Sequence, residues 1–163
     1  INGLEQKDGR KYRADKVSHR FAEGVSSLSL NLEKAYTEGA HVEKWQRTIA
    51  LDREYNRVEV TEQYKLDSLQ IEKDRMNGQV FDNQIILMAY GKPVVQKAGR
   101  ILLQGGMVRL EYDAQYLSAS VEKVQMTDGI MKTQWKDNIY RIILRLNDNY
   151  PMAKMKYRFV ETR

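Results

Sequence analysis

Apolar and polar side chains alternate with a period of two along much of this chain. In residues 45–51 and again in 58–66, every second residue is apolar or aromatic, with one charged exception in each segment. Such alternation is typical of strands that bury one face. The polar segment 52–57 between them predicts a turn, so we expect the two strands to form a hairpin.

The hairpin fixes which residues lie opposite each other. With Leu51 opposite Val58, the register sets Arg47 opposite Glu62. Each of these charges would otherwise stand alone on an apolar face, so we predict that they pair. The same register predicts two further pairs, Ile49 with Val60 and Trp45 with Tyr64.

Similar patterns, bounded by turn residues, predict strands over residues 10–18, 25–32, 83–90, 99–104, 106–113 and 117–125. Gly105-Gly106 predicts a hairpin turn between two of these strands. The last two strands, 140–146 and 153–160, are separated by a turn segment, 147–151. If they pair, five cations lie on one face, namely Arg141, Arg145, Lys154, Lys156 and Arg158. We interpret this face as the solvent-exposed outer face of a sandwich.

About ten short strands at this spacing predict an all-β domain, an antiparallel β-sandwich with little helix that spans residues 1–163. Residues 33–41 are expected to form one helical turn at most. A chain of this length buries enough surface to form a stable core without disulfides or other covalent cross-links. We expect the core to include the aromatic residues at alternating positions, namely Trp45, Tyr64, Tyr112, Tyr140 and Tyr157.

Motifs for catalysis or metal binding are missing from the sequence. There is no cysteine, which excludes disulfides, zinc–thiolate sites and cysteine nucleophiles. His19 and His41 stand in different segments without the spacing of metal ligands. No serine elbow or phosphate loop is present, and no apolar run is long enough to span a membrane. The sequence therefore predicts no catalytic residue, metal or cofactor in this chain.

The net charge of +5 is concentrated in residues 7–20 and 131–163. Basic ends suit a polyanion such as an acidic polysaccharide or a nucleic acid, although a solvated surface is the simpler interpretation. Nucleic acid ranks last, because the aromatic residues alternate inward and do not intersperse with exposed basic residues. Trp135, in the polar segment 132–137 before a strand, either covers a sheet end or touches a ligand.

Several segments, in order along the chain, resemble the C-terminal β-sandwich of heparinase II/III-like polysaccharide lyases. Ile1-Asn2-Gly3, followed by Gln6, Gly9 and Tyr12-Arg13-Ala14, resembles the segment just after the catalytic-histidine motif of that family. The segments 27–36, 45–52 with 58–66, and 135–146 resemble later strands of the same domain.

The resemblance implies a sandwich that packs against an N-terminal α/α toroid, with the active site in the cleft between them. The family cleaves acidic polysaccharides by β-elimination, and the toroid supplies most of the catalytic groups. The histidine that the sandwich supplies would precede Asn2-Gly3 and lie upstream of Ile1, so neither His19 nor His41 takes that role.

We therefore expect a piece of a longer, periplasmic or secreted enzyme that is inactive alone, with its oligomeric state open. The resemblance places Gln6, Arg10 and Lys11 close to the cleft, where cations attract carboxylate or sulfate groups. Trp135 is the fourth candidate for substrate contact. The alternative is an independent carbohydrate-binding or structural module that grips a polysaccharide through its cationic face or Trp135.

Overall fold

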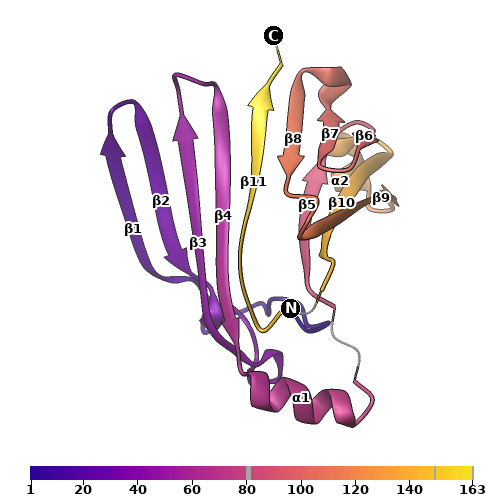
Figure 1. Ribbon diagram of the computed structural model, residues 1–163. Helices are drawn as coiled ribbons and strands as arrows, with labels where there is room; N and C mark the ends of the chain where they lie inside the picture. The colour runs from indigo at the N-terminus through magenta and orange to yellow at the C-terminus, as the bar shows by residue number, and fades with distance from the viewer. Residues whose placement is uncertain (80–81, 149, 163) are drawn as a thin grey trace. The chain divides into compact units, whose positions relative to one another are not determined.

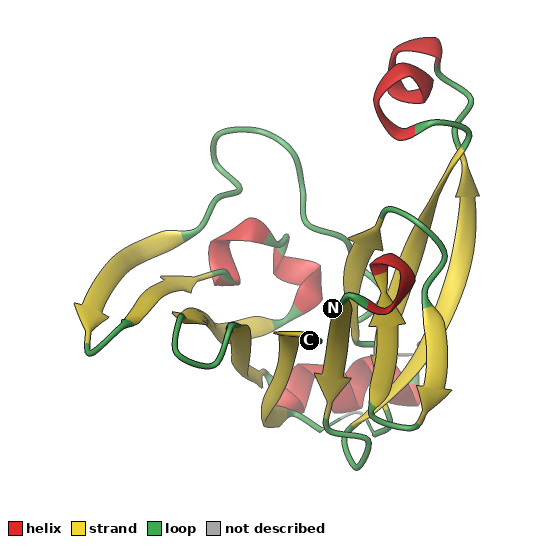
Figure 2. Cartoon of the chain, turned by 90° about the horizontal axis from the view of Figure 1, so that it is seen from above, coloured by secondary structure: helices red, strands yellow, loops and turns green. Residues whose placement is uncertain are grey.

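The computed structural model describes residues 1–79, 82–148 and 150–162, and these contain eleven strands in two antiparallel sheets. Eight strands follow the hydrogen-bonded order β1-β2-β3-β4-β11-β8-β7-β6, and three follow the order β5-β10-β9 (Figure 1). Figure 2 shows how little helix accompanies these strands. The prediction of an antiparallel β-sandwich of about ten strands is confirmed.

The chain divides into two compact units, which are described separately. Unit 1 comprises Ile1–Asn83 and Asp148–Tyr157, and unit 2 comprises Gln84–Asn147 and Arg158–Arg163. Unit 1 contains, in chain order, β1 (Asp15–Ala22), β2 (Val25–Asn31), the 3₁₀ turns η1 (Glu33–Ala35) and η2 (Glu38–Ala40), β3 (Val42–Asp52), β4 (Arg57–Leu66), α1 (Ser68–Met76) and most of β11 (Met152–Glu161).

Strands β3 and β4 form the predicted hairpin. Leu51 lies opposite Val58 and Arg47 opposite Glu62, and the other two predicted pairs are also found. The alternating apolar side chains of this hairpin turn toward the core of unit 1, where Tyr64 is 1% exposed. The register is therefore set by the need to bury one face of both strands.

Unit 2 contains, in chain order, β5 (Gln84–Ala89), β6 (Val94–Lys97), β7 (Arg100–Leu103), the 3₁₀ turn η3 (Gln104–Gly106), β8 (Val108–Tyr112), β9 (Leu117–Gln125), α2 (Gly129–Trp135) and β10 (Asn138–Leu146). Its core draws on both sheets, because Ile101 and Leu110 on one and Leu144 on the other are fully buried. The predicted turn at Gly105-Gly106 joins β7 to β8, and Gly105 has a positive φ of 66°. A residue with a side chain is strained in that conformation, which explains the glycine.

Four of the five aromatic residues assigned to the core are buried, namely Trp45, Tyr64, Tyr112 and Tyr157. Tyr140 on β10 is half-buried. The single helical turn expected over residues 33–41 is found as the two short 3₁₀ turns η1 and η2.

The prediction of little helix is confirmed, but the sequence pattern did not locate α1 and α2. Helix α1 begins after Asp67, whose side chain accepts hydrogen bonds from the backbone amides of Leu69 and Gln70. Ile71 is its buried residue, so the helix has no continuous apolar stripe that the sequence pattern could reveal. Helix α2, capped by Asp128, places Trp135 at a helix end within the polar segment 132–137. No helix in the described part of the chain has the length and apolar character needed to cross a bilayer.

The strand predicted over residues 10–18 is wrong in its bounds, because β1 begins at Asp15. Residues before it form a turn in which the amide of Tyr12 donates to the carbonyl of Gly9 at 3.0 Å. Strand β1 ends the eight-stranded order, and most of its residues are exposed. An exposed edge strand of this kind shows little alternation of apolar and polar residues, so its bounds are difficult to predict from the sequence.

Residues 140–146 and 153–160 both form strands, but these strands do not pair with each other. Strand β10 lies between β5 and β9, whereas β11 lies between β4 and β8. The five cations therefore do not form one face. Asn149 of the predicted turn lies outside the described residues. The flanks are held separately: the side chain of Asn147 donates to the carbonyls of Ala114 and Gln115, and the amide of Leu66 donates to the carbonyl of Pro151.

Candidate functional site

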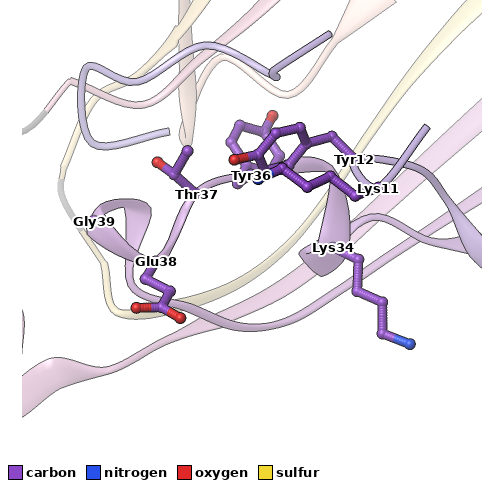
Figure 3. Close-up of a pocket in the computed structure, with 7 residues that line it drawn as sticks. All are labelled: Lys11, Tyr12, Lys34, Tyr36, Thr37, Glu38 and Gly39. Carbon is purple, nitrogen blue, oxygen red and sulfur yellow. The ribbon is translucent and has the colours of Figure 1, made fainter. Parts of the chain in front are cut away.

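A hollow of about 560 Å³ in unit 1 is the candidate site (Figure 3). Its lining comes from two short segments, the turn before β1 and the stretch that carries η1 and η2. The residues that line it are Lys11, Tyr12, Lys34, Tyr36, Thr37, Glu38 and Gly39. In Figure 3, Tyr12 reaches toward Thr37, whereas Lys34 and Glu38 extend away from the two tyrosines.

The N-terminal segment is tied to the second segment by backbone hydrogen bonds. The amide of Lys7 donates to the carbonyl of Ala35 at 3.1 Å. Closer to the N-terminus, buried Asn2 donates from its side chain to the carbonyl of Ala40 at 2.6 Å and from its amide to Oδ1 of Asn83 at 2.8 Å. These contacts hold the otherwise irregular segment in place beside η1 and η2, which brings Lys11 and Tyr12 to the hollow.

The charges of the hollow are partly balanced. Nζ of Lys34 lies 2.5 Å from Oδ2 of Asp15, and this hydrogen bond lowers the pKa of the Asp15 carboxyl. Nζ of Lys11 lies over the ring of Tyr12, 4.8 Å from its centroid. No ion pair involving Lys11 is found among the described residues, so this lysine is available to an anionic ligand.

Tyr36 forms one wall of the hollow and continues into an aromatic stack. Its ring lies parallel to that of Trp45, with centroids 5.7 Å apart, and Trp45 in turn packs on Tyr64 at 5.6 Å. Burial raises the pKa of the Tyr36 hydroxyl, and Arg47 and hydrogen bonding with the side chain of Gln6 oppose the shift. Tyr36 is therefore a neutral, well-supported ring surface rather than a base.

The aromatic stack of Tyr36, Trp45 and Tyr64 is anchored through Trp45 to Glu62, which is completely buried. Nε1 of Trp45 donates to Oε2 of Glu62 at 2.7 Å, and Nε of Arg47 donates to Oε1 at 2.6 Å. The hydroxyl of Tyr157 lies 3.4 Å from the same oxygen. Burial raises the pKa of the Glu62 carboxyl, although Arg47 and these hydrogen bonds oppose it. The predicted Arg47–Glu62 pair is confirmed, and it fixes the orientation of Trp45 beneath Tyr36.

The structure brings together two of the four predicted substrate-binding residues. Lys11 lines the hollow, and Gln6 contacts Tyr36 beside it. Arg10 is exposed in the same segment but does not line the hollow. Trp135 belongs to unit 2, where it ends α2 with 44% of its surface exposed.

Sequence reasoning missed the contributions of Tyr12, Lys34 and Tyr36 to the hollow. All three lie within segments that resemble the lyase domain, but the resemblance gives them no role. They come together through contacts that leave no periodic pattern in the sequence, such as the backbone hydrogen bond from Lys7 to Ala35.

The described residues contain no group of three or more His, Asp or Glu side chains able to hold a metal ion. His19 is exposed on β1, and Nε2 of His41 lies 2.7 Å from Oδ2 of Asp74 on α1. The chemistry that the hollow offers is thus a cation beside aromatic rings, which suits an anionic ligand with an extended apolar surface.

Neither a family model nor a curated protein matches this chain.

Proposed function

We propose that this chain is the β-sandwich part of a heparinase II/III-like polysaccharide lyase, exported to the periplasm or beyond, and that it helps to form the cleft for an acidic polysaccharide. The observation that carries the proposal is the place of the hollow. It is built on Lys11 and Tyr12, which lie within the segment 1–14 that resembles the stretch after the catalytic histidine of those enzymes.

The side chains of the hollow suit a uronate-containing sugar chain. Lys11 offers a charge for a carboxylate or sulfate group, and the rings of Tyr12 and Tyr36 offer flat surfaces for the apolar faces of sugar rings. Tyr36 is held by its stack on Trp45, so its surface is formed before a ligand arrives.

In this proposal the sandwich binds and orients substrate, and the chemistry takes place on groups outside the chain. β-Elimination requires a group that neutralises the uronate carboxylate, a base that removes the C5 proton and an acid that serves the leaving oxygen. Tyr36 has a raised pKa and is unsuited to the role of base at neutral pH. We therefore assign no catalytic residue to this chain.

A second candidate function is that of an independent carbohydrate-binding module. The observation that favours it is the exposure of Trp135 at the end of α2, because an exposed indole is a common platform for sugar rings. In that case the loss of Trp135, and not of Lys11, would abolish polysaccharide binding.

The test uses the full-length enzyme with Gln6→Ala and Lys11→Met, compared with Lys44→Met as a control that removes the same charge from an exposed position on β3. For Lys11→Met we expect KM for the acidic polysaccharide to rise about tenfold with kcat nearly unchanged, because a binding contact is lost. Gln6→Ala is expected to raise KM less, through loss of support for Tyr36.

If Lys11→Met has the same kinetics as Lys44→Met, the hollow is not part of the substrate cleft. If the kinetics of Gln6→Ala are unchanged, Gln6 does not contribute to substrate binding, and the role of Lys11 is not affected by that result. If Trp135→Ala weakens binding and Lys11→Met does not, the independent module is the better interpretation.

A further inference from the structure

A group of four cations lies on one face of the β6–β7–β8 part of unit 2. In the strand register Lys97 is opposite Arg100, and Arg100 is opposite Glu111. Residues that pair in register share a face, and Arg109, two residues before Glu111, shares it as well. Arg158 of β11 joins them through an ion pair with Glu111. We refer to these four cations together with Glu111 as the cationic row.

The cationic row faces away from the core of unit 2. The neighbouring residues Ile101 on β7 and Leu110 on β8 alternate with it along their strands, and both are completely buried. Successive side chains of a strand point to opposite faces, so the row lies on the outer face. Lys97 is exposed, and the side chain of Arg158 is 45% exposed.

Glu111 holds three of the cations in place. Nε of Arg109 and Nε of Arg158 each lie 2.6 Å from one of its carboxylate oxygens, and Nη2 of Arg100 lies 3.6 Å from Oε1. Partial burial opposes ionisation of Glu111, but the hydrogen bonds from Arg158 and Arg109 prevail and lower the pKa of its carboxyl. The carboxylate is thus charged at neutral pH and orients the guanidinium groups.

One carboxylate does not balance four cations, so the row keeps three excess positive charges. Across residues 1–79, 82–148 and 150–162, no second acidic side chain forms an ion pair with Lys97, Arg100, Arg109 or Arg158. Each guanidinium has five N–H donors, and those of Arg109 and Arg158 use Nε toward Glu111. The planar ends of these side chains therefore remain available to an external anion.

We propose that the cationic row is a binding surface for a linear acidic polysaccharide, held through its sulfate or carboxylate groups. Guanidinium groups match such anions with paired hydrogen bonds. Lys97 on β6, Arg100 on β7, Arg109 on β8 and Arg158 on β11 place a cation on each of four neighbouring strands, which lie about 4.8 Å apart, so the row suits a chain with repeated anionic groups. Because Glu111 already orders the arginines, binding immobilises fewer side chains.

The same face favours a polysaccharide over single-stranded nucleic acid. Its remaining described residues on β6 and β7 include Val94 and Leu102, which share the face in register, and none of those on these two strands is aromatic. Binding of single strands relies on aromatic side chains that stack on bases. The row lies entirely in unit 2, so this proposal does not rest on the role of the hollow in unit 1.

The test is calorimetric titration of the 163-residue chain with a heparin-derived oligosaccharide at low and moderate salt. The variant Lys97→Gln/Arg100→Gln removes two cations and keeps both short bonds to Glu111, which limits damage to the fold. The control Arg20→Gln/Lys44→Gln removes two exposed charges from β1 and β3 in unit 1. Unchanged thermal unfolding of both variants checks that they are folded.

We expect wild type and control to bind alike, and the row variant to bind about tenfold or more weakly with a reduced salt dependence. Equal affinity of the row variant and the control, or no binding by the wild type, would overturn the proposal. Duplex DNA that binds as tightly, and with the same loss in the row variant, would overturn the assignment to polysaccharide. The affinity of the row variant tests the row, whereas the KM of Lys11→Met in the full-length enzyme tests the hollow, so the two proposals fail separately.

Discussion

Nε of Arg47 on β3 lies 2.6 Å from Oε1 of Glu62 on β4, and the two residues are opposite each other in the hairpin register. The carboxylate is completely buried, whereas the side chain of Arg47 is 29% exposed. The pair therefore joins the interior of unit 1 to its surface, directly below the aromatic stack that supports Tyr36.

Removal of Arg47 should destabilise the protein strongly. Arg47→Ala leaves the Glu62 carboxylate buried without its charged partner, and we expect a loss of about 3–5 kcal/mol in the free energy of unfolding. Arg57→Ala serves as the control, because Arg57 pairs with Asp52 at 2.9 Å near the exposed turn of the same hairpin. Because both side chains of that pair keep some contact with solvent, 34% and 13% exposed, the pair should contribute less, about 1 kcal/mol. Denaturant unfolding of both variants measures the difference, and equal losses would show that the burial of Glu62 carries no penalty.

The titration of Glu62 should contribute to the dependence of the free energy of unfolding on pH. Burial raises the pKa of this carboxyl in the folded state above the unfolded value of about 4.3. The stabilisation linked to its proton is therefore complete below that unfolded value and is lost as pH rises through the folded pKa. Relative to Glu62→Gln, which does not titrate, the wild type should lose stability as pH rises from about 4. A relative gain with rising pH in urea titrations would mean that attraction to Arg47 outweighs burial.

The hydrogen bond from Trp45 to Glu62 should contribute separately. Trp45→Phe keeps a ring beside Tyr36 and Tyr64 but removes the Nε1 donor, which lies 2.7 Å from Oε2. We expect a loss of roughly 1.5–3 kcal/mol in the free energy of unfolding, the range for a hydrogen bond to a charged group. Chemical denaturation monitored by circular dichroism measures it. If Trp45→Phe is as stable as the wild type, Glu62 does not orient this ring.

A comparison of alanine substitutions at two glycines of unit 2 distinguishes the cost of backbone strain from the cost of steric contact. Gly99 and Gly105 both have positive φ, 83° and 66°, but a Cβ at Gly99 would lie 3.0 Å from the carbonyl oxygen of Tyr112, whereas one at Gly105 meets nothing within 4 Å. Gly105→Ala should cost about 1–2 kcal/mol from the left-handed conformation alone. Gly99→Ala should cost more, because the β7–β8 hairpin must also shift. Thermal midpoints of the two variants give the order, and a larger loss for Gly105→Ala would contradict it.

The β3–β4 hairpin could be predicted from the sequence because its information is local. Two alternating segments, a polar turn and one charge on each apolar face leave a single register that pairs Arg47 with Glu62. Helix α1 could not be recognised in this way, since Ile71 is its buried residue and its other signal is the cap Asp67. The neighbours of β11 come from distant parts of the chain, so alternation revealed the strand but not its sheet.

The candidate site was predictable only in part. The resemblance predicts Gln6 and Lys11 because they lie close to the position of the family's catalytic histidine; Lys11 lines the hollow and Gln6 contacts Tyr36 beside it. Their partners Tyr36 and Thr37 are more than twenty residues away along the chain. The contacts that join the segments include a backbone hydrogen bond from Lys7 to Ala35 and one from the side chain of Asn2 to the carbonyl of Ala40. Because both acceptors are backbone carbonyls, the side-chain pattern of the second segment does not mark these contacts.

A β-elimination assay that compares the full-length protein with the 163-residue chain on heparan, chondroitin, hyaluronan and alginate tests the proposed function. We expect the full-length protein to release unsaturated products from at least one of these polysaccharides and the isolated chain to release none. Cleavage by the isolated chain would contradict the assignment of catalysis to groups outside it. A full-length protein that cleaves none of the four would contradict the proposed function on these substrates.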